Sequence, residues 1–180
     1  ETTKWKLKAQ QRIRIHLGTS ESLAKIVYIP KIISSGESIN AVLEFNKPVT
    51  TALDDRFIIR AYSPIDTIGG GKILDKDPEG TWKKIKVQCQ QLSNQVTERF
   101  LQFITYSENA PKSVGFWADK FSKSREYIHI LVESNQLVNK KDMVFSDEGK
   151  ENSKKSILEF LTAFHKKNPY REFINSESVR

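Results

Sequence analysis

Cysteine is nearly absent from this 180-residue chain, which contains only Cys89. A single cysteine excludes an internal disulfide and any C-x-x-C metal pair. Long apolar runs are absent too, because no stretch approaches the roughly 20 residues that a membrane span requires. No charged segment followed by an apolar run indicates an export signal. We therefore expect a cytoplasmic protein that does not associate with a membrane.

The sequence also lacks recognisable catalytic and metal-binding signatures. It shows no Ser-His-Asp arrangement, metal-ligand cluster or carboxylate pair, although residues distant in sequence can meet in a fold. Cys89 has no neighbouring histidine or activating cluster, and His16 has no partner at metal-ligand spacing. We expect no catalysis, no bound metal and no cofactor within these residues.

Positive charge is in excess, with a formal net charge of +7. Such an excess favours an anionic partner, because clustered Lys and Arg raise the affinity for phosphate backbones. It is also a common route to solubility. Both halves of the chain are mildly positive, so the charge alone does not choose a binding face.

The most informative stretch runs from Asp54 to Asp75. Residues 56–61 alternate with the period of a half-buried strand. Their two faces carry Phe57, Ile59 and Ala61 on one side, and Arg56, Ile58 and Arg60 on the other. Ser63-Pro64 supplies a turn because proline fixes φ, and residues 67–74 form a second extended run. These features predict a β-hairpin.

Three consecutive glycines, Gly69 to Gly71, lie in the second strand of this hairpin. Glycine in a strand packs nothing, so the run predicts a bulge, a barrel corner or a closely approaching backbone. A phosphate loop would read G-x-x-x-x-G-K-[ST], but Lys72 is followed by Ile73, so no nucleotide site is assigned here. We expect a structural hairpin that closes a small barrel.

Further strands are predicted at residues 11–17, 23–29 and 37–45, which gives at least five strands in about 65 residues without a helix. Such an order indicates a small antiparallel barrel or sandwich. In the first of these strands, Arg12, Arg14 and His16 share the outer face. These three groups could contact RNA phosphates, or they could form a solvated face that prevents sheet aggregation.

The hairpin resembles the last hairpin of the third domain of translational GTPases, in which an R-F-x-I-R strand and a turn precede T-[VI]-G-x-G. Residues 56–60 and 67–71 match that pattern. The Tyr62-Ser63-Pro64 turn and the triple glycine are similar to the selenocysteine-specific elongation factors, the SelB family. Residues 15–21 and 43–48 agree with this narrower match. The resemblance covers residues 11–75 and, more loosely, the remainder.

This resemblance implies a GTP-dependent factor that delivers selenocysteinyl-tRNA to the ribosome, with the barrel gripping the acceptor and T arm of the tRNA. Candidate tRNA-binding residues are Arg12, Arg14, His16, Arg60, Tyr62, Ser63 and Thr67. It also implies that GTP and magnesium bind to a GTPase domain outside these residues, and that later repeats hold an mRNA hairpin. Because the sequence begins at Glu1 and not at methionine, we expect a piece of a longer protein. We also expect that protein to be a monomer.

The second half of the sequence predicts three short helices followed by a two-stranded wing, which is the order of a winged helix. A last helix is predicted from about Ser153 to Lys167, with Ile157, Leu158, Leu161 and Phe164 on its buried side. The expected organisation is multidomain. It comprises an antiparallel β-barrel (1–76), a linker (77–92), an α+β winged-helix domain (93–150), and a connecting helix with the start of a second winged-helix repeat (151–180).

The winged helix leaves a second function open, a DNA-binding transcriptional regulator whose barrel is a sensor or dimerisation module. The third helix, however, offers mainly Arg125 and His129 beside two glutamates, whereas a base-reading helix presents several Arg, Asn or Gln side chains. Lys140 and Lys141 at the wing tip are secondary candidates for phosphate contact, with solvated turn lysines as the alternative.

Overall fold

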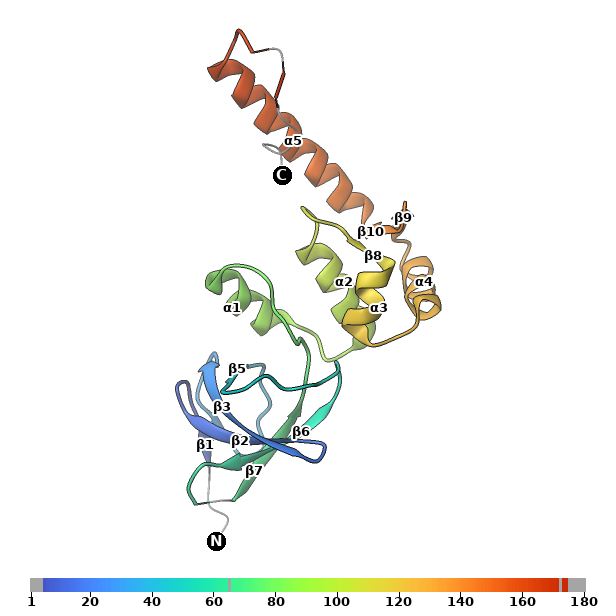
Figure 1. Cartoon of the computed structure of the whole chain (residues 1–180). Helices are drawn as coiled ribbons and strands as arrows, with labels where there is room; N and C mark the ends of the chain where they lie inside the picture. The colour runs from blue at the N-terminus through green and yellow to red at the C-terminus, as the bar shows by residue number, and fades with distance from the viewer. Residues whose placement is uncertain (1–4, 65, 172, 175–180) are drawn as a thin grey trace. The chain divides into compact units, whose positions relative to one another are not determined.

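The computed structural model describes residues 5–64, 66–171 and 173–174. They divide into two compact units, Glu1–Arg99 with Lys120–Ser122, and Phe100–Asp119 with Lys123–Arg180 (Figure 1). The first half of the chain forms β1 (Lys6–Leu7), β2 (Arg12–Leu17), β3 (Ser20–Tyr28), β4 (Ile33–Ser34), β5 (Val42–Phe45), β6 (Arg56–Ala61), β7 (Thr67–Lys72) and α1 (Trp82–Gln91). The second half forms α2 (Val96–Tyr106), β8 (Lys112–Ser113), α3 (Val114–Phe121), α4 (Arg125–Ser134), β9 (Val138–Lys140), β10 (Met143–Phe145) and α5 (Asp147–Lys167).

A five-stranded antiparallel sheet forms the body of the first unit, in the order β5-β3-β2-β6-β7. The short strands β1 and β4 pair separately. Within the described residues no ladder joins β5 to β7, so hydrogen bonds do not close the sheet into the full barrel that we predicted. The predicted strand at residues 37–45 is also shorter, because only β5 is extended and paired.

Alternation along β2 sorts its side chains as predicted. Ile13 and Ile15 are fully buried, whereas Arg12 is exposed and Arg14 and His16 are half-buried on the other face. Burying an isoleucine side chain stabilises a fold by roughly 1.5–3 kcal/mol. The core to which this strand contributes consists of Ile13, Ile15, Ala24, Ile26 and Ile29, with Phe45, Phe57 and Ile59 packed against it.

The glycine run lies in β7, an edge strand that pairs with β6 through a ladder with one register shift. A Cβ atom added to Gly70 would lie 2.8 Å from the carbonyl oxygen of Phe57, and one added to Gly71 would overlap the Phe57 ring. Around Gly69 the space is open. The bulge and the close backbone approach predicted from the triple glycine are therefore both present.

Replacing Gly70 with alanine should destabilise the protein by roughly 1–3 kcal/mol, because the added methyl group meets main-chain atoms that cannot rotate away. Gly69→Ala is the matched control, since its Cβ meets nothing within 4 Å. We expect that variant to unfold within about 1 kcal/mol of the native chain. Urea denaturation followed by circular dichroism measures both, and equal free energies of unfolding for the two variants would contradict the close approach.

Helix α1 occupies most of the interval 77–92, which we predicted to be a linker. Thr81 caps the helix by accepting a hydrogen bond from the Lys84 N–H. At the other end Asn40 Nδ2 donates to the carbonyl oxygens of Cys89 and Leu92. No residue of α1 is buried, so the helix lacks the apolar stripe that sequence periodicity detects.

A buried arginine holds the chain after α1 to the sheet of the first unit. Arg99 is fully buried, and its Nη2 donates to Asp54 Oδ2 at 2.6 Å. Lys72 Nζ lies 3.0 Å from the other oxygen of the same carboxylate. These two cations share the Asp54 carboxylate. Burial opposes ionisation of Asp54, yet Lys72 and Arg99 outweigh it and lower its pKa.

Asp54→Asn should destabilise the protein by about 2 kcal/mol or more, because it leaves the buried Arg99 guanidinium without its counterion. Asparagine tolerates the positive φ of 68° at this position, so backbone strain does not confuse the result. A carboxylate with a lowered pKa contributes stability above its unfolded-state pKa, and this contribution is lost as the pH falls through the folded-state value. Free energies of unfolding measured between pH 7 and pH 3 should therefore converge for the two proteins.

The second unit orders its elements as α2, β8, α3, α4, β9 and β10. Its three-stranded antiparallel sheet has the order β8-β10-β9. β9 continues to Lys140, so the β9–β10 loop is the pair Lys141 and Asp142, both with positive φ (52° and 67°). Two central residues with positive φ are typical of a type I′ hairpin turn.

Aromatic rings dominate the core of the second unit. Trp117 is 2% exposed, and its ring contacts Phe100 and Phe116 edge-on and stacks on Phe103. Ile128, Leu131 and Val132 complete this core from α4. The core of this unit is therefore built from one face each of α2, α3 and α4.

Helix α5 begins at Asp147, earlier than the predicted Ser153, because the Ser146 hydroxyl caps it by accepting from the Gly149 N–H. Its predicted buried side is wrong. Ile157 and Leu158 are 43% and 55% exposed, and Leu161 and Phe164 are half-buried. The predicted start of a second repeat at 170–180 lies partly outside the described residues, as does the beginning of the interval 1–76.

Candidate nucleic-acid interface

The outer face of β2 and β6 gathers most of the predicted tRNA-binding residues. Antiparallel pairing places Arg14 directly opposite Arg60, with Leu23 of β3 on the other side of Arg14. In the neighbouring row of the same face, His16 lies opposite Ile58. We name this surface, Arg12, Arg14, His16, Ile58 and Arg60, the β2–β6 face.

One carboxylate meets two members of the β2–β6 face. Arg14 Nη1 donates to Glu21 Oε1 at 2.5 Å, and His16 Nε2 lies 3.2 Å from Glu21 Oε2. The hydrogen bond from Arg14 lowers the pKa of Glu21, and the nearby charges of Arg14, His16 and Arg60 act in the same direction. Glu21 is exposed, so water screens these contacts and they add little to stability.

The side-by-side arginines are an unfavourable pair in the absence of an anion. Like charges directly opposite each other on adjacent strands repel, and the single carboxylate of Glu21 is hydrogen-bonded to Arg14. The Nε atoms of Arg14 and Arg60 are enclosed yet have no hydrogen-bond partner among the residues that the structure describes. The outward nitrogens of two adjacent guanidinium groups can instead donate to a phosphate, which accepts such bonds strongly.

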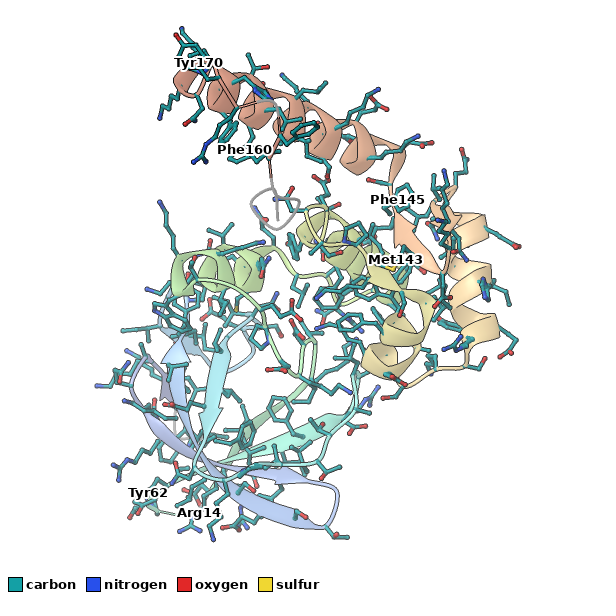
Figure 2. The ribbon with its side chains drawn as sticks, turned by 45° about the horizontal axis from the view of Figure 1, so that its top comes forward. Arg14, Tyr62, Met143, Phe145, Phe160 and Tyr170 are labelled. Atoms are coloured by element: carbon teal, nitrogen blue, oxygen red, sulfur yellow. The ribbon has the colours of Figure 1, made fainter. Side chains whose placement is uncertain are left out.

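The other candidate tRNA-binding residues of the first unit lie beside the Arg14–Arg60 pair. The Arg14 guanidinium carbon lies 5.5 Å from the centre of the Tyr62 ring, and Figure 2 shows these two side chains together at one end of the first unit. Thr67 is exposed and pairs with Arg60 across the β6–β7 ladder. Ser63 is also exposed, in the turn between the two strands. The structure therefore brings these candidates to one region of the first unit.

Two secondary candidates belong to the other unit. Lys140 ends β9 and Lys141 begins the type I′ turn, and both side chains are exposed. Glu21 and Ile58, by contrast, are parts of the site that sequence reasoning missed. The signal for Glu21 was available, because a two-residue turn at Gly18-Thr19 places it opposite His16.

We also searched the described part of the chain for metal ligands, membrane-spanning helices and a reactive cysteine. No group of three or more His, Cys, Asp or Glu side chains there could hold a metal ion. Among the helices described, none has both the length and the apolar character needed to cross a membrane. Burial raises the pKa of Cys89 to about 11, which disfavours the thiolate that a nucleophile requires.

Comparison with known proteins identifies the first unit. Residues 1–80 match the family model described as "Selenocysteine-specific elongation factor, beta-barrel domain". Residues 1–80 belong to this domain family. The resemblance drawn from the hairpin and the triple glycine is confirmed, and the β2–β6 face is a surface of a SelB-type β-barrel domain.

Two relatives have the same description. The chain is 31% identical over 70 residues to the selenocysteine-specific elongation factor of Desulfomicrobium baculatum, a match over 38% of this chain and 11% of that protein. It therefore spans a small part of this curated SelB relative. A crystal structure of a bacterial selenocysteine-specific elongation factor, EF-Sec, aligns with a TM-score of 0.40 and 13% identity, covering 87% of this chain and 35% of that one.

The raised pKa of Cys89 predicts a slow thiol. With a pKa of about 11, only about a thousandth of the group is thiolate at pH 8, against roughly a quarter for an ordinary cysteine. Reaction with a disulfide reagent at pH 8 should therefore be far slower in the native protein than in urea. Equal rates in the two conditions would contradict the burial of this side chain.

Proposed function

We propose that the chain is part of a GTP-dependent elongation factor that delivers selenocysteinyl-tRNA to the ribosome. In this proposal the β2–β6 face grips the acceptor and T arm of the tRNA. The observation that carries it is the Arg14–Arg60 pair, two cations held opposite each other on a SelB-type domain. An anion that bridges both side chains removes the repulsion between them.

Recognition on this face is electrostatic and based on shape. Arginine forks bind phosphate oxygens of the backbone, and A-form RNA presents its phosphates and 2′-hydroxyls without the need to read bases. The hydroxyls of Tyr62, Ser63 and Thr67 are suited to such sugar and phosphate contacts. Gly70, which lies opposite Ile58, leaves its part of the outer face of β7 without a side chain, so a ribose can approach the main chain there.

Glu21 competes weakly with RNA phosphates for Arg14. In the free protein its carboxylate occupies Arg14 and lies beside His16, so an incoming phosphate competes with it. Because the contact is exposed and weak, the competition costs little. A small anion must compete with Glu21 in the same way. It gains fewer contacts than an RNA backbone, because it cannot reach both arginines and the flanking hydroxyls at once.

For the second unit we propose a winged helix that connects the barrel to repeats holding an mRNA hairpin. The order α2, β8, α3, α4, β9, β10 and the sheet order β8-β10-β9 support this assignment. A DNA-binding regulator has less support, because α4 exposes Glu126, Ile130 and Glu133 where a recognition helix needs donors to bases. Lys140 and Lys141 are proposed to contact phosphates.

The rest of the assignment follows from the SelB proposal. GTP and magnesium would bind outside these 180 residues, since no phosphate-loop pattern occurs in them. The factor would act as a cytoplasmic monomer, with the ribosome contacted by parts of the protein beyond this chain.

The double substitution Arg14→Gln and Arg60→Gln should lower the affinity for a selenocysteine tRNA minihelix by at least about tenfold, because charge-assisted hydrogen bonds contribute roughly 1.5–3 kcal/mol each. The salt dependence of binding should also become shallower, since fewer counterions are released. Fluorescence anisotropy titrations at several salt concentrations measure both quantities.

Two controls make this test specific. Lys47→Gln removes one exposed charge elsewhere in the first unit and should leave the affinity within about twofold. Glu21→Gln frees Arg14 and should strengthen binding. If the double variant binds the minihelix as tightly as the native chain, or if duplex DNA of equal length binds better than the minihelix, the proposed function is wrong.

A further inference from the structure

Helix α1 presents an aromatic and basic surface that the proposed tRNA grip does not use. Trp82 is 45% exposed and Val87 is 48% exposed, although both are large and apolar. The Trp82 ring meets Tyr28 edge-on with centroids 6.3 Å apart. Lys86 Nζ lies 5.3 Å from the Trp82 ring centre and 5.5 Å from that of Tyr28. We call Trp82, Lys83, Lys86 and Val87 the α1 surface.

The charges of α1 oppose its own stability. Trp82–Gln91 contains three lysines and no acidic residue, and all three lysines lie in its N-terminal half. Cations near a helix N-terminus are disfavoured by the helix dipole, and Lys83 and Lys86, three residues apart, repel each other. An anionic partner would offset this arrangement.

Anchoring α1 does not explain the exposed tryptophan. The C-terminal end of the helix is held by Asn40 and by Gln90, whose Nε2 donates to the Tyr28 hydroxyl. Trp82 lies at the opposite end, where nearly half of its surface stays in water. The contact with Tyr28 leaves much of the Trp82 ring exposed. Lys86 adds a positive charge beside both rings.

We propose that the α1 surface binds single-stranded RNA, with a base stacked on Trp82 and the flanking phosphates beside Lys83 and Lys86. Aromatic side chains bordered by cations are the usual platform for unpaired nucleotides, because every base has a π face. The α1 surface is separate from the β2–β6 face. Figure 2 shows Arg14 and Tyr62 at the end of the first unit away from α1.

This inference goes beyond the proposed tRNA grip, because it assigns a second RNA contact to the same unit. The two contacts differ in chemistry. The β2–β6 face offers paired guanidinium groups and hydroxyls to a helical backbone, whereas the α1 surface offers an indole ring to an unpaired base. A factor with both could hold a tRNA arm and an unpaired RNA segment at once.

The test uses the full 180-residue chain and a labelled twelve-nucleotide oligoadenylate, with fluorescence anisotropy at low salt. Trp82→Leu should weaken binding by at least about fivefold, the equivalent of one stacked base at the low end of 1–3 kcal/mol. Trp82→Phe keeps an aromatic face and should recover most of the affinity. Lys83→Gln should weaken binding and flatten its salt dependence, while the matched change Lys47→Gln should not.

Lys83→Gln also guards against a folding artefact, because the Lys83 side chain is exposed. The Arg14→Gln and Arg60→Gln variant should lose less oligoadenylate affinity than Trp82→Leu, since it leaves α1 intact. The inference is overturned if Trp82→Leu and Lys83→Gln both bind like the native chain. It is also overturned if the arginine variant, and not Trp82→Leu, loses oligoadenylate binding. The minihelix titration judges the tRNA grip independently.

Discussion

The two-residue repeat of the strand backbone is the constraint on which the first unit depends. Ile13 and Ile15 enter the core, so the pleat directs Arg14 and His16 to the opposite face. β6 follows the same alternation in register, and Arg60 therefore meets Arg14. Burial of apolar side chains holds two cations in a position that their mutual repulsion opposes, and this is the physical basis of the anion binding that we propose for the β2–β6 face.

Much of this face could be predicted from the sequence because it depends on local periodicity. The alternation at residues 56–61 and along β2 fixes which side chains share a face, whatever the rest of the fold does. The ion-pair partner of a single charged residue was less predictable. Asp54 pairs with Arg99, a residue 45 positions away that only tertiary packing brings close.

The helices show the other limit of sequence reasoning. α1 has no buried residue, and caps at Thr81 and Asn40 stabilise it in place of an apolar stripe, so its sequence resembles a hydrated linker. In α5 the apolar positions Ile157 and Leu158 were correctly placed on one face, but a sequence pattern does not reveal whether anything covers that face. Periodicity predicts the helix; burial depends on a neighbour.

The close contact at Gly70 has a consequence for how this domain can change over time. Any side chain at that position collides with the Phe57 carbonyl oxygen, so stability alone keeps position 70 without one. The space at Gly69 is open, so sequence change along the glycine run is easiest at that position.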